Sequence, residues 1–317
     1  MKSVFVGFGG ALPQRCIKND ELSGSLDTSD EWISQRTGIK QRYVVGSSES
    51  TSTLATQAAK EALSYAKVSP NDIDLIIVGT TTGDYTFPAT ACVVQKNLGI
   101  TNRCPAFDIS AACSGFVYSL DVADSFIRMG KARYALVIGA DCFSKILDWN
   151  DRSSCVLFGD GAGAIVLKAE DNTDKGVQYC RIYSDGSYTN YLVTNGGVST
   201  TQKAGVVTMK GREVFKFAVE KFYESIQELL KENNLKIEDI DLIVPHQANV
   251  RIINKLIEML KIDPGKVVIT IDKHSNTSAA TIPLALNEVK EKIGSGKKVV
   301  LLSMGAGFTW GAALVNM

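Results

Sequence analysis

The stretch Asn71-Asp-Ile-Asp-Leu-Ile-Ile-Val78 decides the fold, because a close copy returns as Ile237-Glu-Asp-Ile-Asp-Leu-Ile-Val-Pro245. Each is an unbroken apolar run that follows an acidic segment, the pattern of a strand in a parallel sheet with both faces covered. Asp74 and Asp241 are 167 positions apart. An internal copy at this separation indicates two related halves.

The elements around the two strands recur in the same order. An amphipathic helix precedes each strand, at 53–66 and 213–231, and strands joined by small-residue turns close each half, at 134–168 and 298–315. We therefore predict an α/β fold with duplicated halves, residues 1–169 and 170–317, packed about a pseudo-twofold axis. Within this plan we expect strands at 156–158 and 267–271, and an irregular insertion over 170–210.

Composition and charge exclude several function classes. Lys and Arg number 34, as do Asp and Glu, so no net field attracts nucleic acid or an anionic membrane. Seven cysteines without C-x-x-C spacing or a histidine cluster favour reduced thiols over disulfides or a metal site. The first residues do not resemble a signal peptide, and no apolar run is long enough to cross a bilayer. We expect a cytoplasmic protein with no metal, nucleic acid or membrane partner.

A second stretch, Asp108-Ile-Ser-Ala-Ala-Cys113-Ser-Gly-Phe116, places a cysteine where a buried strand passes into a helix. Small neighbours let a substrate approach closely, and the positive end of the helix dipole favours the thiolate, which attacks carbonyl carbon. A dipole contribution of up to about 2 kcal/mol leaves such a thiol roughly half ionised at neutral pH. These residues alone leave open whether Cys113 is a nucleophile or an ordinary buried cysteine.

Two residues of the second half are candidates to act with Cys113. Asn276 follows Cys113 by 163 positions, close to the repeat separation, so the two take similar places in their halves. His246 ends the repeated strand, whereas His274, the only other histidine, is expected to be structural. Because α/β folds place sites at the carboxyl ends of strands, we expect Cys113, His246 and Asn276 to form one site.

Six motifs carry a resemblance to a known family. They are Asp-Glu-Trp-Ile-Ser-Gln-Arg-Thr-Gly-Ile (30–39), Ala-Ala-Cys-Ser-Gly-Phe (111–116), Phe-Gly-Asp-Gly-Ala-Gly (158–163), Pro-His-Gln-Ala-Asn (245–249), His-Ser-Asn-Thr-Ser-Ala-Ala (274–280) and Gly-Phe-Thr-Trp-Gly (307–311). In this order they resemble β-ketoacyl-acyl-carrier-protein synthase III, which starts chains in bacterial type II fatty-acid synthesis. The resemblance implies a thiolase-like fold of five αβαβα layers, a homodimer, and no cofactor or metal.

The resemblance also implies a Cys-His-Asn condensing enzyme. Cys113 would accept an acyl group from a short acyl-CoA, in the first place acetyl-CoA, and malonyl-acyl carrier protein would lose carbon dioxide and attack that acyl group. His246 would support the thiolate of Cys113, and His246 and Asn276 would donate hydrogen bonds to the thioester oxygen as negative charge develops there. The backbone N–H groups of Cys113 and Ala306 would form a separate oxyanion hole, with Ala306 where the family usually has glycine.

Binding residues follow from the same resemblance. Coenzyme A would contact Trp32, Arg36, Arg152, Gly211, Phe215, Ala218 and Asn249. The acidic carrier protein would dock on Lys216, Gln247, Ala248, Asn249, Val250 and Arg251, with Lys210, Arg212 and Lys255 adding positive charge. Phe87 would form a wall of the primer pocket across the dimer.

Three other interpretations fit parts of the sequence. A papain-like cysteine hydrolase also orders Cys, His and Asn along the chain, but no tryptophan closely follows Cys113 and the halves are duplicated. A non-catalytic thiolase-fold protein would not need to keep Cys113, His246 and Asn276 together. A specialised condensing enzyme of secondary metabolism would keep a similar site and differ in its nucleophile or primer.

Overall fold

The computed structural model describes residues 1–317, and its first sheet uses only strands from the first 170 residues. The strand order is β1 (Lys2–Ala11), β7 (Asp160–Glu170), β6 (Tyr134–Cys142), β4 (Leu75–Gly79) and β5 (Ala106–Ile109). β4 is parallel to β5 and β6. In β4, Leu75 and Ile77 pack on one face and Ile76 and Val78 on the other. A strand covered on both faces has no polar side, which explains its unbroken apolar run.

The second sheet repeats this plan with strands from the rest of the chain. Its order is β8 (Gly176–Ser184), β13 (Thr309–Asn316), β12 (Lys298–Gly305) and β11 (Leu242–Pro245). β11 is parallel to β12, while β12, β13 and β8 alternate in direction. These directions match those of β4, β6, β7 and β1 strand for strand. The predicted duplication is therefore visible in the two sheets, while a division at 169/170 stays a prediction.

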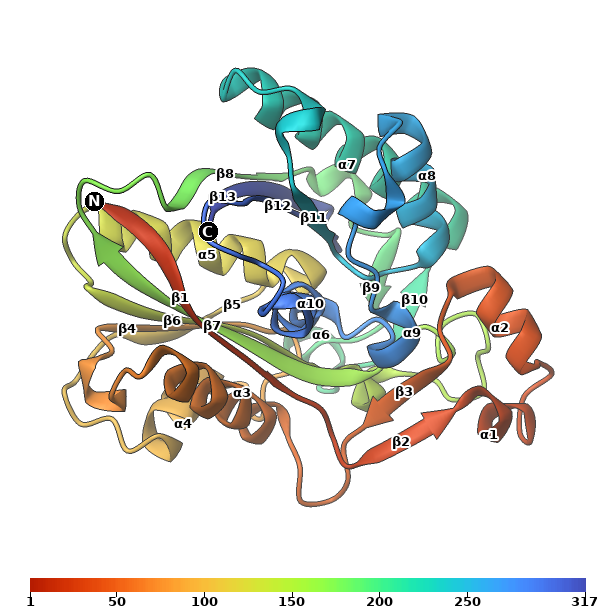
Figure 1. Cartoon of the computed structure of the whole chain (residues 1–317). Helices are drawn as coiled ribbons and strands as arrows, with labels where there is room; N and C mark the ends of the chain where they lie inside the picture. Colours follow the sequence, from red (N-terminus) through yellow and green to blue (C-terminus); the bar gives the residue numbers. More distant parts are fainter.

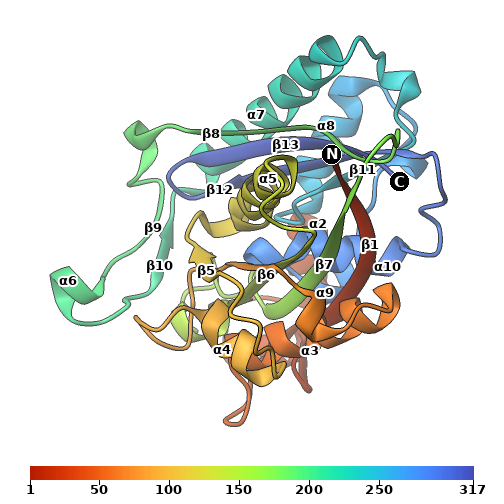
Figure 2. The same ribbon diagram turned by 90° about the vertical axis from the view of Figure 1, so that its left-hand side faces the viewer.

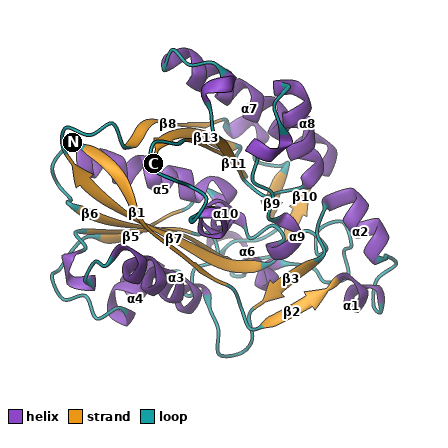
Figure 3. Ribbon diagram, in the orientation of Figure 1, coloured by secondary structure: helices purple, strands orange, loops and turns teal.

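Helices form three more layers around the sheets (Figure 1). The outer face of the first sheet is covered by α3 (Thr51–Ala66) and α4 (Thr90–Asn97). The space between the sheets holds α5 (Gly115–Arg128) and α10 (Thr281–Val289). The outer face of the second sheet is covered by α7 (Gly211–Glu232) and α8 (Val250–Leu260). The alternation of helix and strand layers, clear in Figure 3, confirms the predicted αβαβα arrangement.

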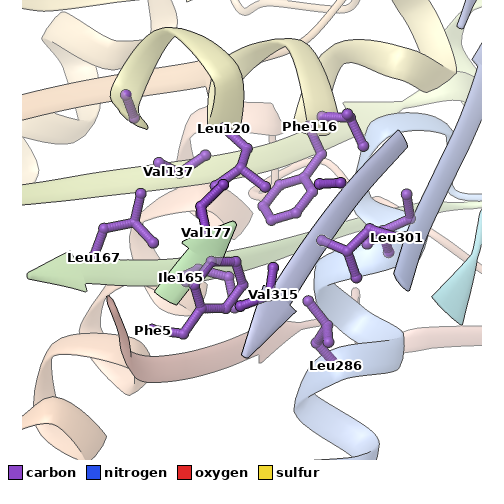
Figure 4. Close-up of a cluster of buried hydrophobic side chains, with 14 of the residues drawn as sticks. Phe5, Phe116, Leu120, Val137, Ile165, Leu167, Val177, Leu286, Leu301 and Val315 are labelled. Atoms are coloured by element: carbon purple, nitrogen blue, oxygen red, sulfur yellow. The ribbon is translucent and has the colours of Figure 1, made fainter. Parts of the chain in front are cut away.

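The largest buried cluster lies in the central layer. Phe116 of α5 and Leu286 of α10 pack with Val137 of the first sheet and Leu301 of the second, and all four are fully buried (Figure 4). Burying a side chain of this size stabilises the fold by about 1.5–3 kcal/mol. This packing fixes the two central helices, and the turns before them carry Cys113 and Asn276.

Two smaller regions flank the five layers. β2 (Arg15–Lys18) pairs with β3 (Gln41–Val44), beside α1 (Asn19–Ser23) and α2 (Asp30–Thr37). β9 (Leu192–Thr194) pairs with β10 (Val207–Met209), and the hairpin between them carries α6 (Val198–Thr201) outward from the body (Figure 2). Both regions border the cavities described below.

Three of the sequence predictions are wrong. Residues 156–158 form turns and one bridge, and β7 begins only at Asp160. The strand is continuous through its glycines, and Gly163 lies so close to α10 that a side chain would not fit. The segment 170–210 is not irregular throughout, since it contains β8, an edge strand whose polar residues remain partly exposed. Residues 267–271 make only the bridge between Ile243 and Val267 before α9 (Ile271–His274) begins.

Glycines allow close backbone contacts beside the central helices, both within the first half and between the two halves. A Cβ on Gly79 of β4 would lie 2.5 Å from the carbonyl carbon of Gly115, and one on Gly139 of β6 would clash with the carbonyl of Ala279. Gly115 follows Cys113 by two residues, and Ala279 follows Asn276 by three. These contacts therefore set the distance between the two turns.

We expect Gly139→Ala to lower the free energy of unfolding by about 1–3 kcal/mol, because its methyl group would meet rigid backbone. The matched control is Gly294→Ala, at an exposed position with no neighbouring atom within 4 Å, which should change stability by less than about 0.5 kcal/mol. Urea denaturation compares the two variants. Equal midpoints would contradict the assigned contact between the halves.

Candidate active site

Cys113 lies where the first sheet passes into the central helix layer. β5 ends at Ile109, a 3₁₀ turn spans Ala112–Ser114, and α5 begins at Gly115. Ala112 has a φ of 44°, a left-handed conformation that non-glycine residues adopt rarely and often at functional sites. Only 4% of Cys113 is exposed. The turn thus holds a single buried thiol at the end of a partly buried edge strand, and not of the fully buried strand that the sequence predicts.

Burial keeps the Cys113 thiol protonated. Desolvation raises the pKa of Cys113 to about 12; the buried carboxylate of Asp141 adds to the rise, and the neighbouring Ser278 hydroxyl opposes it. The expectation from the helix dipole alone, a thiol about half ionised, is wrong. A dipole effect of up to about 2 kcal/mol is smaller than the cost of placing an unpaired anion in this cavity. Another group must therefore take the thiol proton as Cys113 attacks.

His246 follows β11 and is a neutral imidazole. Its backbone N–H donates to the carbonyl of Leu302 at 2.7 Å, and its Nδ1 lies 2.6 Å from Oγ1 of Thr281. No protein group hydrogen-bonds to Nε2, and the residue lines the same cavity as Cys113. Burial lowers the pKa of His246 to about 3. The ring can therefore accept or donate a hydrogen bond through Nε2 according to its tautomer.

Asn276 is held by contacts that leave one end of its amide free. Its backbone N–H donates to Leu157 O, and its carbonyl accepts from the N–H of Gly159, both at 3.0 Å. Oδ1 accepts from the N–H of Ser278 at 2.9 Å, and Ser278 itself has a left-handed φ of 54°. Because Oδ1 is occupied, Nδ2 is the free end of the amide. Asn276 therefore offers a neutral donor.

The structure brings Cys113, His246 and Asn276 together around one cavity of 410 Å³. The predicted coenzyme A residues line the same cavity: Trp32, Arg36, Arg152, Gly211, Phe215, Ala218 and Asn249. Arg152 is exposed and Cys113 is buried. The cavity is therefore a channel that leads from the surface to the thiol.

Cations gather around an aromatic side chain at the outer end of this channel. The guanidinium carbons of Arg36 and Arg152 lie 4.7 Å and 5.1 Å from the ring centroid of Trp32. Nη1 of Arg152 also lies 3.1 Å from Oδ2 of Asp27. A planar, positively charged surface of this kind suits an aromatic base that carries phosphates.

Comparison with known proteins assigns the family. The model for 3-oxoacyl-[acyl-carrier-protein (ACP)] synthase III matches residues 107–186, and that for its C-terminal part matches residues 230–317. The chain is 52% identical, over 317 residues and 99% of both proteins, to a beta-ketoacyl-[acyl-carrier-protein] synthase III of Rhizorhabdus wittichii. The chain belongs to the β-ketoacyl-acyl-carrier-protein synthase III family.

Solved structures support this membership. A 3-oxoacyl-[acyl-carrier-protein] synthase III of Aquifex aeolicus VF5 has a TM-score of 0.94 and 47% identity, covering 99% of this chain and 100% of that one. The priming β-ketosynthase of the R1128 polyketide pathway has a TM-score of 0.93 and 31% identity, covering 99% and 96%. The family and the thiolase-like fold predicted from six motifs are thus confirmed.

The residues that we predict for carrier-protein docking in this synthase III chain differ in exposure. Lys216 and Arg251 are exposed, and Ala248, Asn249 and Val250 are partly buried. Gln247, by contrast, is 1% exposed, and its amide bonds the carbonyls of Pro245 and Val268 and the N–H of Thr270. The inclusion of Gln247 in the docking surface is therefore wrong, because its side chain turns inward and links β11 to the segment before α9.

A second cavity, of 590 Å³, lies on the other side of Cys113 and is lined in part by Ala306 and by Val193 and Val198 of the β9–β10 hairpin. The hydroxyl of Thr309 lies 3.0 Å from the carbonyl oxygen of Ala306 and 3.1 Å from that of Ala111, which ties the Ala306 turn to the Cys113 turn. Phe87 does not line this cavity within one subunit; its side chain is 84% exposed.

Sequence reasoning missed Asp141 and Thr281. Asp141 is fully buried, and its Oδ1 accepts from the Thr81 N–H at 2.9 Å and from the Thr82 hydroxyl at 2.7 Å. Burial raises the pKa of Asp141. A carboxylate near the end of a core strand, with a run of threonines after the neighbouring strand, could have suggested such a site. Thr281 has only its position after the Asn276 motif as a signal.

His274 lies outside the channel, with Nε2 3.5 Å from Oε1 of Glu288. Burial lowers the pKa of His274. No group of three His, Cys, Asp or Glu residues is placed to hold a metal ion. None of the helices combines the length and the apolar character that crossing a membrane requires.

Proposed function

We propose that this protein catalyses the decarboxylating condensation of a short acyl-CoA, acetyl-CoA in the first place, with malonyl-acyl carrier protein. The observation that carries the proposal is the convergence of a thiol, a neutral imidazole and a free amide N–H group on one channel. The products are a 3-oxoacyl-carrier protein, coenzyme A and carbon dioxide, and the reaction starts fatty-acid chains. It uses no metal or redox cofactor, and it belongs in the cytoplasm, where both substrates are found.

In the first half-reaction, Sγ of Cys113 attacks the thioester carbonyl of acyl-CoA. The carbon–sulfur bond to coenzyme A breaks, and a bond to Sγ forms. The thiol proton passes to the departing coenzyme A sulfur, so the exchange neither consumes nor releases a proton. Because burial raises the pKa of Cys113 to about 12, Nε2 of the neutral His246 is the acceptor through which this proton moves.

In the second half-reaction, the malonyl carboxylate leaves as carbon dioxide, and its electron pair forms an enolate whose charge lies on the thioester oxygen. Nδ2 of Asn276 and a protonated Nε2 of His246 stabilise that oxygen. The enolate carbon then attacks the acyl group on Cys113, and the released thiolate takes one proton from solvent. The backbone N–H groups of Cys113 and Ala306 serve the tetrahedral acyl intermediate, in keeping with the position of both residues at the 590 Å³ cavity.

Coenzyme A occupies the 410 Å³ channel in this proposal. Its adenine stacks at Trp32, where Arg36 and Arg152 supply positive charge. Its pantetheine arm passes Gly211, Phe215, Ala218 and Asn249 on the way to Cys113. Carrier protein docks at the same entrance, on Lys216, Arg251 and the partly buried residues 248–250, where the exposed positive charge suits an acidic partner.

The working form is a homodimer in which Phe87 closes the primer cavity of the other subunit. β5 is the edge strand of the first sheet and all four of its residues are only partly buried. Nearby, Phe87 and Tyr85 are 84% and 63% exposed. An open edge and exposed aromatic rings favour a self-association surface at this face.

The proposal is tested by reconstitution with acetyl-CoA and malonyl-carrier protein. The wild-type protein should release carbon dioxide and form acetoacetyl-carrier protein, with acetyl-CoA preferred over longer or branched acyl-CoA. Cys113→Ser should lose the condensation by at least about 10³-fold, because a neutral hydroxyl is a far weaker nucleophile toward a thioester. Condensation retained in Cys113→Ser, or the absence of product from every primer, would contradict the proposal.

Asn276→Ala should spare acylation of Cys113 within a few fold and lower decarboxylation by about 10²–10³-fold, the effect of removing one oxyanion donor. Asn276→Asp is the second variant, because it keeps the oxygen that accepts from the Ser278 N–H and replaces the donor with a carboxylate oxygen that repels the enolate. Single-turnover acylation and carbon dioxide release are measured separately. Normal decarboxylation in Asn276→Asp would show that Asn276 stabilises the turn but does not stabilise the enolate.

A further inference from the structure

The hydroxyl of Thr281 lies between a ring nitrogen and a backbone carbonyl. Its Oγ1 is 2.6 Å from Nδ1 of His246 and 3.1 Å from the carbonyl oxygen of Ser278. Both His246 and Thr281 are 2% exposed. Solvent therefore cannot substitute for either partner, and the single hydroxyl proton can serve only one of the two acceptors at a time.

Two arrangements of protons satisfy this geometry. In the first, the hydroxyl donates to the Ser278 carbonyl and accepts from Nδ1–H, which leaves Nε2 of His246 as an acceptor toward the cavity. In the second, the hydroxyl donates to Nδ1, and Nε2 carries the proton. Each arrangement is a neutral imidazole in the opposite tautomer.

The change of tautomer releases the Nδ1 proton to water and binds one proton from the channel at Nε2, so it is neutral overall. The hydroxyl turns with this exchange and leaves no buried group unpaired. The Ser278 carbonyl already accepts the backbone N–H of Thr281, so it keeps a partner when the hydroxyl turns away. The protonated imidazolium is not an alternative resting state. Burial lowers the pKa of His246 to about 3, and Thr281 opens α10, whose positive dipole end also opposes a cation.

The two half-reactions require opposite tautomers. Transfer of the Cys113 proton to coenzyme A requires Nε2 as an acceptor, whereas stabilisation of the enolate requires Nε2–H as a donor. We propose that Thr281 is a positioning residue whose hydroxyl turns to let the neutral His246 serve as acceptor in acylation and as donor in decarboxylation. This inference rests on the proposed function, and it assigns to Thr281 the step between the two half-reactions.

Thr281→Val tests the proposal, since valine keeps the shape and removes the hydroxyl. An unpaired buried N–H is less tolerable than an unpaired acceptor, so the variant should hold His246 as the Nε2–H tautomer. Single-turnover acylation should then fall by about 10-fold or more, since proton transfer typically contributes 10²–10⁴-fold to a rate. Decarboxylation by enzyme that has first been fully acylated should stay within about threefold of wild type. Thr281→Ser, which keeps the hydroxyl, should leave both rates within the same range.

The tautomer can be read without activity, by ¹⁵N NMR of protein labelled at histidine, because the chain has only two histidines. The wild type should show both tautomers of His246, or their average, and Thr281→Val only the Nε2–H form. The proposal is overturned if both rates fall by equal factors, if neither rate changes, or if the tautomer is the same in wild type and Thr281→Val. If the wild type shows no turnover while the NMR spectra show the expected tautomers, the result refutes the proposed function and not the role of Thr281. If Thr281→Val does not fold, Thr281→Ala removes the same hydroxyl and is judged by the same criteria.

Discussion

The burial of Cys113 and His246 is the constraint on which the rest of the site depends. Burial disfavours both the thiolate and the imidazolium, so the resting pair is a thiol beside a neutral ring and not an ion pair. Nε2 of a neutral imidazole can be a hydrogen-bond acceptor or a donor, according to the tautomer, whereas Nε2 of an imidazolium can only donate. Asn276 is buried at the same site, so its amide donor interacts with developing charge more strongly than it would at the protein surface.

The site is buried because backbone meets backbone around the two turns, both within the first half and between the halves. Gly79 faces Gly115 within the first half, Gly139 faces Ala279 of the second half, and a Cβ on Gly305 would lie 2.8 Å and 2.9 Å from the backbone nitrogens of Cys113 and Ser114. Asp141 strengthens this junction, because its carboxylate accepts hydrogen bonds from the threonine loop after β4 and lies 3.4 Å from the N–H of Ala279. Small residues and one buried acid thus place a turn of the first half against a turn of the second.

The repeated apolar strands and the six motifs were enough to predict the layered fold, the family and the three residues that meet in the channel. Predictions from local sequence patterns are wrong where contacts between distant parts of the chain determine the structure. The apolar pattern does not reveal β8, because an edge strand keeps polar residues. It does not reveal that β7 continues through its glycines, because the need for Gly163 comes from contact with α10, which is distant in sequence. The predicted charge state of Cys113 is also wrong, because the sequence indicates that Cys113 lies at the start of a helix but does not indicate that the thiol is removed from solvent. The motif alone predicts that Gln247 belongs to the docking surface, although its side chain turns inward.

The neutrality of the Cys113–His246 pair is tested most directly by the pH dependence of single-turnover acylation with acetyl-CoA. With the pKa of His246 near 3 and that of Cys113 near 12, neither group titrates between about pH 5.5 and 9. The rate constant should therefore stay constant within about twofold across that range. A rise with an apparent pKa between about 6 and 8.5 would show that an ionised thiolate or a titrating imidazole carries the reaction, and it would contradict this account.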